Sequence, residues 1–207
     1  DKERYRASLQ PILKAAQSQA TKGDSAAARA SYQEILALEP DWPEAIDAFA
    51  WFLCDASIQS KNHGSQRAAL ADAETMLTLA TRRQSLAPED PLALRLLSCA
   101  SDQAADVLIL RRQPGDAEKA LAHYRRGLEI WEKLLTAHPD SAQAARDLAV
   151  SHYKLAAFAE GQGDLVGKTK HHRACYDILA LRIANGVTFD PPVMKLFEEL
   201  KQEFGGK

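Results

Sequence analysis

Apolar residues recur at intervals of three and four residues along almost the whole chain. In 116–135 a set of apolar residues recurs at such steps, namely Ala117, Ala120, Leu121, Tyr124, Leu128, Trp131 and Leu135. This spacing places them on one face of an α-helix, because a helix makes one turn every 3.6 residues. The same analysis predicts helices near 3–21, 24–38, 42–58, 65–85, 90–112, 116–137, 141–160, 165–184 and 191–203. Valine, which favours strands, occurs only five times, so we expect no strand of three or more residues.

Prolines divide these helices into units of nearly constant length. Pro40, Pro88, Pro139 and Pro191 follow one another at intervals of 48 to 52 residues, a period typical of repeated supersecondary units. Each unit would hold two antiparallel helices. The pattern predicts a single domain with repeats at 1–40, 41–88, 89–139 and 140–190, followed by a capping helix at 191–204.

Short polar signals mark the turns inside the units. Gly-Asp pairs at 23–24, 115–116 and 163–164 predict turns, because Gly ends a helix in the left-handed conformation and Asp caps the next helix. The second unit lacks this pair, and 60–65 is predicted to form a longer loop there. Asp190 followed by Pro191 predicts the start of the last helix.

Residues 23–45 and 115–128 resemble the tetratricopeptide repeat (TPR). In the first segment Ala28 holds the small-residue position and Tyr32 the aromatic one, and Pro40 ends the unit; Ala120 and Tyr124 hold the same two positions in the second. Residues 147–165 are similar to the long-helix bacterial form of the repeat. The resemblance implies a right-handed α-solenoid of four helix pairs that acts as a protein-binding scaffold, as the recognition part of a larger bacterial protein.

The chain departs from the TPR pattern at two places. In the last repeat the small and aromatic positions hold Lys168 and His172, which predicts weak packing of that helix. The chaperone-binding members of the family grip a C-terminal carboxylate with Lys and Asn side chains. The matching positions here are Leu13, Gln17 and Ala48, so that function is not carried over.

The family's concave groove implies a binding surface for a peptide or protein segment. Its positions in this sequence are Gln10, Leu13, Gln17, Glu44, Asp47, Trp51, Asp55, Asp102, Asp106 and Tyr153. Acidic side chains dominate this set, so we expect a basic or amphipathic ligand. The alternative is that Trp51 and Tyr153 are core residues, because a register shift of one residue would bury them.

Composition narrows the other possibilities. The 207 residues carry a net charge of −2, which gives no reason to expect a nucleic-acid ligand, and no apolar run reaches membrane-spanning length. Three scattered cysteines, without a CxxC pair, fit a reducing compartment, and we expect a cytoplasmic protein.

Two segments imitate chemical motifs. Residues 161–169 nearly spell a phosphate-binding loop, but Gln162 replaces the required glycine and no strand precedes it. His171, His172 and Cys175 form the densest set of potential metal ligands, which leaves a metal-dependent sensor or enzyme as one alternative; a self-associating scaffold or homo-oligomer is another. Because no complete catalytic or ligand set is assembled, we expect no enzyme activity, no metal and no cofactor.

Overall fold

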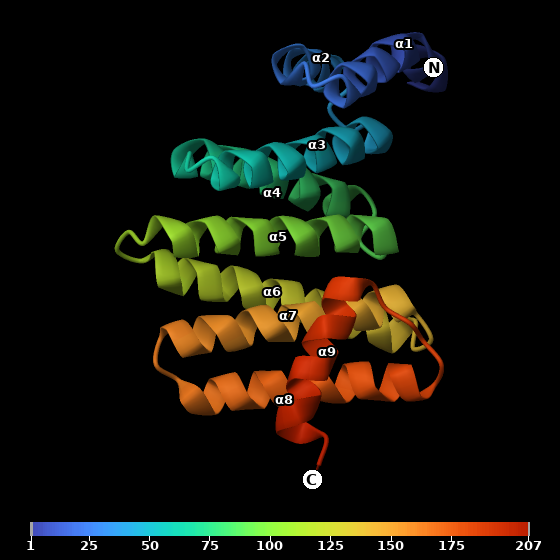
Figure 1. Cartoon of the computed structure of the whole chain (residues 1–207). Helices are drawn as coiled ribbons and strands as arrows, with labels where there is room; N and C mark the ends of the chain where they lie inside the picture. Colours follow the sequence, from blue (N-terminus) through green and yellow to red (C-terminus); the bar gives the residue numbers. More distant parts are fainter. Residues whose placement is uncertain (1, 207) are drawn as a thin grey trace. The chain divides into compact units, whose positions relative to one another are not determined.

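The chain is all-α. A computed structural model describes residues 2–206, and it contains helices and turns but no strand in that range (Figure 1). The helices are α1 (Lys2–Thr21), α2 (Ser25–Leu38), α3 (Pro43–Asn62), α4 (Gln66–Leu86), α5 (Pro91–Arg111), α6 (Asp116–Ala137), α7 (Ala142–Gly161), α8 (Leu165–Ala184) and α9 (Pro191–Phe204). Helices that are neighbours in the sequence pack on one another within each compact unit, as α3 does on α4 and α7 on α8. The predicted all-helical fold is confirmed and is consistent with a helical solenoid.

The predicted turn signals do what their chemistry requires. Gly23 and Gly163 have φ angles of +81° and +77°, in the left-handed region that glycine enters at low cost. The Asp24 carboxylate accepts a hydrogen bond from the Ala27 amide, and the Asp164 carboxylate accepts one from the Gly167 amide. These bonds satisfy amides that a helix leaves unpaired in its first turn.

One predicted boundary is wrong. α3 continues to Asn62, so half of the loop predicted at 60–65 is helical. The turn needs only the residues around Gly64, which has a φ angle of +77°. Lys61 lies in the last turn of α3, where its positive charge complements the carboxyl end of the helix.

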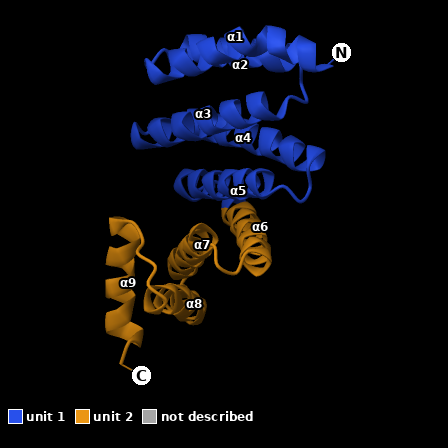
Figure 2. Ribbon diagram, turned by 90° about the vertical axis from the view of Figure 1, so that its right-hand side faces the viewer, with its two compact units in different colours: residues 1–116 blue, residues 117–207 orange. Residues whose placement is uncertain are grey.

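Residues 1–116 form one compact unit, which contains α1 to α5 (Figure 2). α1 packs on α2, α3 on α4 and α4 on α5, and α3 also contacts α1 and α5. Ala28, Tyr32 and Ile35 are buried on α2, and the Tyr32 ring stacks on Phe49 with centroids 5.2 Å apart. This unit therefore places the first helices of its pairs, α1, α3 and α5, next to one another.

Residues 117–207 form the second compact unit, in which α7 and α8 pair and α9 packs across α8 (Figures 1 and 2). The α9 core residue Phe197 stacks on Tyr176 of α8 with centroids 5.6 Å apart, and Cys175 and Leu179 lie in the same buried cluster. Asp190 caps α9 by accepting from the Val193 amide, as predicted, and it also binds Arg146 of α7.

The boundary between the units lies between α5 and α6, inside the repeat predicted at 89–139. The handedness of the solenoid and the single domain therefore stay predictions. None of the helices in residues 2–206 combines the length and the apolarity that crossing a bilayer requires.

Candidate functional site

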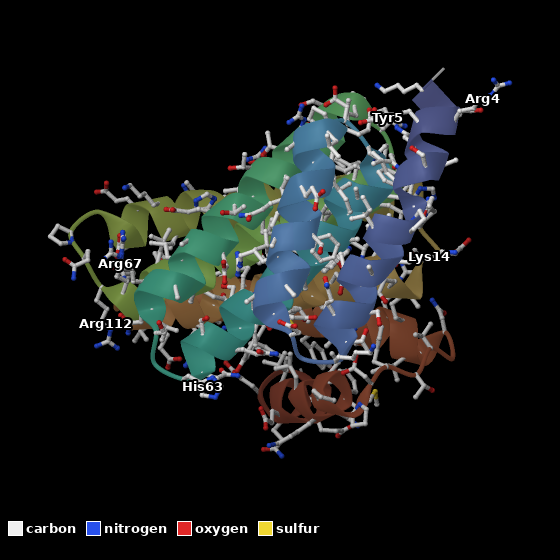
Figure 3. The ribbon with its side chains drawn as sticks, turned by 90° about the horizontal axis from the view of Figure 1, so that it is seen from above. Arg4, Tyr5, Lys14, His63, Arg67 and Arg112 are labelled. Carbon is white, nitrogen blue, oxygen red and sulfur yellow. The ribbon has the colours of Figure 1, made fainter. Side chains whose placement is uncertain are left out.

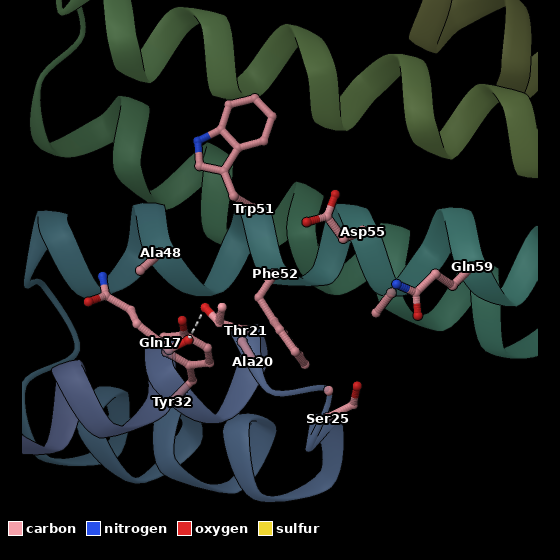
Figure 4. Close-up of a pocket in the computed structure, with 12 residues that line it drawn as sticks. Gln17, Ala20, Thr21, Ser25, Tyr32, Ala48, Trp51, Phe52, Asp55 and Gln59 are labelled. Carbon is pink, nitrogen blue, oxygen red and sulfur yellow. Dashed lines mark hydrogen bonds between the residues drawn. The ribbon is translucent and has the colours of Figure 1, made fainter.

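Trp51 marks an open face in the first unit. Its side chain projects from the middle of α3 toward α5 and is 38% exposed, whereas the other tryptophan of this unit, Trp42, is 1% exposed (Figure 4). Trp51 is therefore a surface residue, and the alternative that it belongs to the core does not hold. A large exposed aromatic ring between two neighbouring helices is a common feature of binding surfaces.

A cavity of about 440 Å³ lies on one side of Trp51, between α3 and the pair formed by α1 and α2 (Figure 4). Tyr32 and Phe52 supply aromatic surface to it, and their rings lie 5.5 Å apart. Polar side chains of Gln17, Asp55 and Gln59 complete its lining. This mixture suits a ligand side chain that has an apolar body and a polar end.

A second cavity, also of about 440 Å³, lies between α3 and α5 and shares Trp51 as a wall. Its other lining residues are Asp47, Leu92 and Arg95. The Arg95 guanidinium carbon lies 5.9 Å from the centre of the Trp51 ring, within the range of a cation–π contact. Leu92 is 64% exposed, so it adds a second apolar side chain to the open face.

Basic side chains of the same unit neutralise part of the predicted acidic surface. Arg83, which is 7% exposed, binds Asp47 with Nε 3.1 Å from Oδ1 and binds Asp90 with Nη2 2.5 Å from Oδ2. Burial raises the pKa of Asp47, and Arg83 only partly offsets this effect. Burial would also raise the pKa of Asp90, but hydrogen bonds from the Leu92 amide and from Arg83 outweigh it and lower that pKa. Arg83 therefore connects α4 to α3 and to the N-cap residue of α5.

The structure separates the predicted groove residues into three groups. Gln10, Gln17, Glu44 and Asp55 are exposed. Asp106 is half-buried and lies 3.9 Å from Lys61 (Asp106 Oδ2 to Lys61 Nζ). Asp102 is buried, with 9% exposed, so its predicted place on the groove surface is wrong. Leu13 is only 4% exposed, so its placement on the groove surface is wrong. It belongs to a buried stripe with Leu9 and Ala16, whose spacing of four and three residues turns that face of α1 into the core.

Sequence analysis missed Leu92 and Arg95, although a signal for them exists. Pro43 and Pro91 each occupy the start of their helix. Counted from these prolines, Leu92 and Arg95 on α5 correspond to Glu44 and Asp47 on α3. The family-based alignment used residues farther along α5 and so passed over the first turn, where the cavity lies.

Tyr153 belongs to the second unit, in which histidines accompany it. Tyr153 is 41% exposed and stacks on His172 with ring centroids 5.9 Å apart. His152 of α7 and His171 of α8 approach each other with their Nδ1 atoms 3.0 Å apart. Burial, the neighbouring His171 and Lys170 lower the pKa of His152 to about 4. Burial, Lys170 and Arg125 also lower the pKa of His171.

The proposed metal ligands do not share one environment. His171 lines a cavity of about 510 Å³ together with residues of α6 and α7. Cys175 is completely buried in the cluster beneath α9, where burial raises the pKa of its thiol to about 12. Within residues 2–206 no group of three His, Cys, Asp or Glu side chains could hold a metal ion. The histidine pair and the thiol are therefore not parts of a common site.

The segment that imitates a phosphate-binding loop is a helix–turn–helix connection. The Gly167 amide is engaged by Asp164, and a Cβ atom at Gly167 would lie 2.2 Å from Asp164 Oδ2. Lys168 binds Glu160 with Nζ 2.6 Å from Oε1. Gly167 thus allows the close approach of the capping carboxylate, and Lys168 pairs across the turn.

No protein-family model matches the sequence, and no curated protein matches it. Among the solved structures that are similar to the chain are two crystal structures of MamA. One is 15% identical with a TM-score of 0.31, and the match covers 88% of this chain and 98% of that one. The other is 16% identical with a TM-score of 0.26, and the match covers 81% of this chain and 95% of that one. A likeness at this level says nothing of a shared site or activity.

Proposed function

We propose that this chain is a protein-interaction module, and that a peptide or protein segment binds across Trp51 along α1, α3 and α5. The observation that carries the proposal is the exposed Trp51 ring between two cavities of the same unit. Binding energy at protein interfaces concentrates on a few large side chains, among which tryptophan is frequent.

Apolar surface gives this site its affinity. Trp51 and Leu92 are exposed, and the half-buried Phe52 ring lines the cavity beside α1. An apolar ligand side chain placed against these groups would leave water, which is worth about 25 cal/mol for each Å² of apolar surface that becomes buried. An amphipathic segment, whether helical or extended, can supply such a side chain and keep its polar face in solvent.

Charge contributes to orientation and to the rate of encounter. Glu44 and Asp55 are exposed on α3, whereas Asp47 and Asp106 face Arg83 and Lys61. The preference for a basic ligand therefore rests on Asp55 and Glu44. We expect a basic residue of the ligand to lie near Asp55, in the cavity that Gln17 and Gln59 also line.

A selection experiment tests the proposal. Random short peptides displayed on phage would be selected on the purified protein and the enriched sequences synthesised. We expect Trp51→Ala to weaken their binding by about 2 kcal/mol, which is close to thirtyfold in affinity. Tyr5→Ala is the matched control, because Tyr5 is also an exposed aromatic residue, 44% exposed, on α1 (Figure 3).

The result has a clear contrary outcome. If no peptide is enriched, or if the enriched peptides bind Trp51→Ala as tightly as the parent, Trp51 does not anchor a ligand and the proposal fails. Light scattering on the same samples at several concentrations reports whether the open face instead binds a second copy of the chain.

A further inference from the structure

Arg95 differs from the other basic residues around Trp51, because its charge has no acidic partner. Arg83 binds two carboxylates and Lys61 lies beside Asp106. No ion pair of the described residues includes Arg95, and its Nε atom is buried without a hydrogen-bond partner. Arg95 as a whole is half-buried, so this Nε–H has given up water without gaining a partner, which is costly for the free protein.

The surroundings of Arg95 hold it in place for a ligand. Its guanidinium lies over the Trp51 ring, and Arg95, Leu92 and Trp51 line one cavity. Stacking on an aromatic ring leaves the edge of a guanidinium available for hydrogen bonds in its own plane, which is the geometry that carboxylates use. Asp47 lines the same cavity, but its carboxylate is paired with Arg83, whose Nε donates to Oδ2 and lies 3.1 Å from Oδ1.

We infer that Arg95 binds the side-chain carboxylate of an aspartate or glutamate in the segment that lies across Trp51. This inference rests on the proposed function and deepens it by naming the chemistry of the ligand. The bound segment carries an acidic residue at the cavity of Leu92 and Arg95, and an apolar residue on Trp51.

The two cavities give the ligand a direction. Asp47, Trp51 and Asp55 follow one another at intervals of four residues along α3, so they occupy successive turns on one face. Arg95 lies on the Asp47 side of Trp51, and the exposed Asp55 lies on the other. An acidic residue at the first position and a basic residue at the second would therefore fix the polarity of the segment in the groove.

The test uses the random peptide library on the whole chain, with peptides made afterwards with amidated C-termini so that only side chains supply carboxylates. We expect enrichment of an Asp or Glu close to an apolar residue. Changing that acid to its amide in the peptide, or Arg95→Gln in the protein, should each lower affinity about tenfold. Combining the two changes should cost little more than either alone, because both remove the same interaction.

Two further variants separate a loss of binding from a loss of folding. Arg95→Lys keeps the charge and the packing of the stem but loses the planar donor pair, so we expect an intermediate loss even if Arg95→Gln unfolds. Arg67→Gln on α4 is the matched control and should leave affinity unchanged (Figure 3).

The outcomes separate the two proposals. Peptides that depend on Trp51 but contain no enriched acid, or that bind Arg95→Gln like the parent, overturn the inference about Arg95 and leave the proposed function standing. Peptides that ignore Trp51, or the absence of any enriched peptide, overturn both.

Discussion

α2 and α8 begin in the same way and pack differently. Each helix follows a Gly-Asp turn in which the glycine is left-handed and the aspartate caps the first turn. Five residues after the glycine, α2 has Ala28, which is completely buried, and α8 has Lys168, which pairs with Glu160. Four residues later, α2 buries Tyr32 on Phe49, whereas α8 places His172 on the exposed Tyr153. Turn chemistry thus sets where a helix starts, and a separate set of residues decides how strongly it packs.

α9 covers part of α8 and supplies apolar contacts that Lys168 and His172 do not provide. The buried residues Cys175 and Leu179 of α8 lie in one cluster with Phe197 and Leu200 of α9. The second half of α8 therefore packs against α9, whereas the polar residues Lys168 and His172 lie in its first half.

The sharpest test of this contrast exchanges the aromatic position of each helix for alanine. We expect Tyr32→Ala to lower the free energy of unfolding by about 3–5 kcal/mol, because Tyr32 is 2% exposed and its removal leaves a cavity. His172→Ala, at the matching position of α8, should cost less than about 1 kcal/mol. Urea denaturation followed by circular dichroism measures both losses. Equal losses would show that Tyr32 and His172 contribute equally to the packing of their helices.

The small-residue position offers a second comparison. Ala28→Leu and Ala120→Leu should each cost about 1–3 kcal/mol, because both alanines are completely buried and a larger side chain would force the helices apart. Ala122→Leu on the exposed face of α6 is the control and should change stability by less than about 0.5 kcal/mol. If the two buried positions accept leucine as readily as Ala122 does, the helices do not approach closely there.

The histidine pair predicts a smaller effect that depends on pH. The pKa of His152 is lowered to about 4 from an ordinary value of 6.5, so the unfolded chain binds a proton more readily than the folded one. The contribution of His152 to stability is therefore complete above pH 6.5 and is lost as the pH falls toward 4. Between pH 7 and pH 5 we expect a loss of about 1–2 kcal/mol.

Thermal unfolding across that pH range checks this effect against variants. His152→Gln should flatten the dependence, and His63→Gln, at an exposed position, should not. If the parent and His152→Gln lose stability in parallel between pH 7 and pH 5, the burial of His152 and its contact with His171 do not cause the loss.

Much of the fold follows from local signals in the sequence. Gly23, Gly163 and Asp190 mark helix boundaries because their chemistry acts within one turn, and the structure confirms those boundaries. α3 is different: Ser60, Lys61 and Asn62 suit a loop or a helix end, and only the position of Gly64 decides between them.

The candidate site was less accessible from the sequence, because it depends on contacts between helices. Periodicity identifies an apolar face of α1, but it does not determine whether that face packs in the core or lines the groove. Leu13 therefore could not be placed from the sequence. The ion pairs of Arg83 join residues 36 and 7 positions apart, and no spacing rule predicts them. Counting from Pro91 predicts that Arg95 lies beside the groove. Only the structure shows that Arg95 has no acidic partner.

Asp190 connects the start of α9 to α7. It accepts from the Val193 amide in the first turn of α9 and holds Arg146 of α7, and these interactions lower its pKa, with Arg146 as the larger cause. α9 has 14 residues, a length at which an isolated helix is marginal in water. The helix therefore gains its start signal in full only where α7 is already in place. We therefore expect α9 to form as it docks on this unit and not ahead of the helices that it contacts.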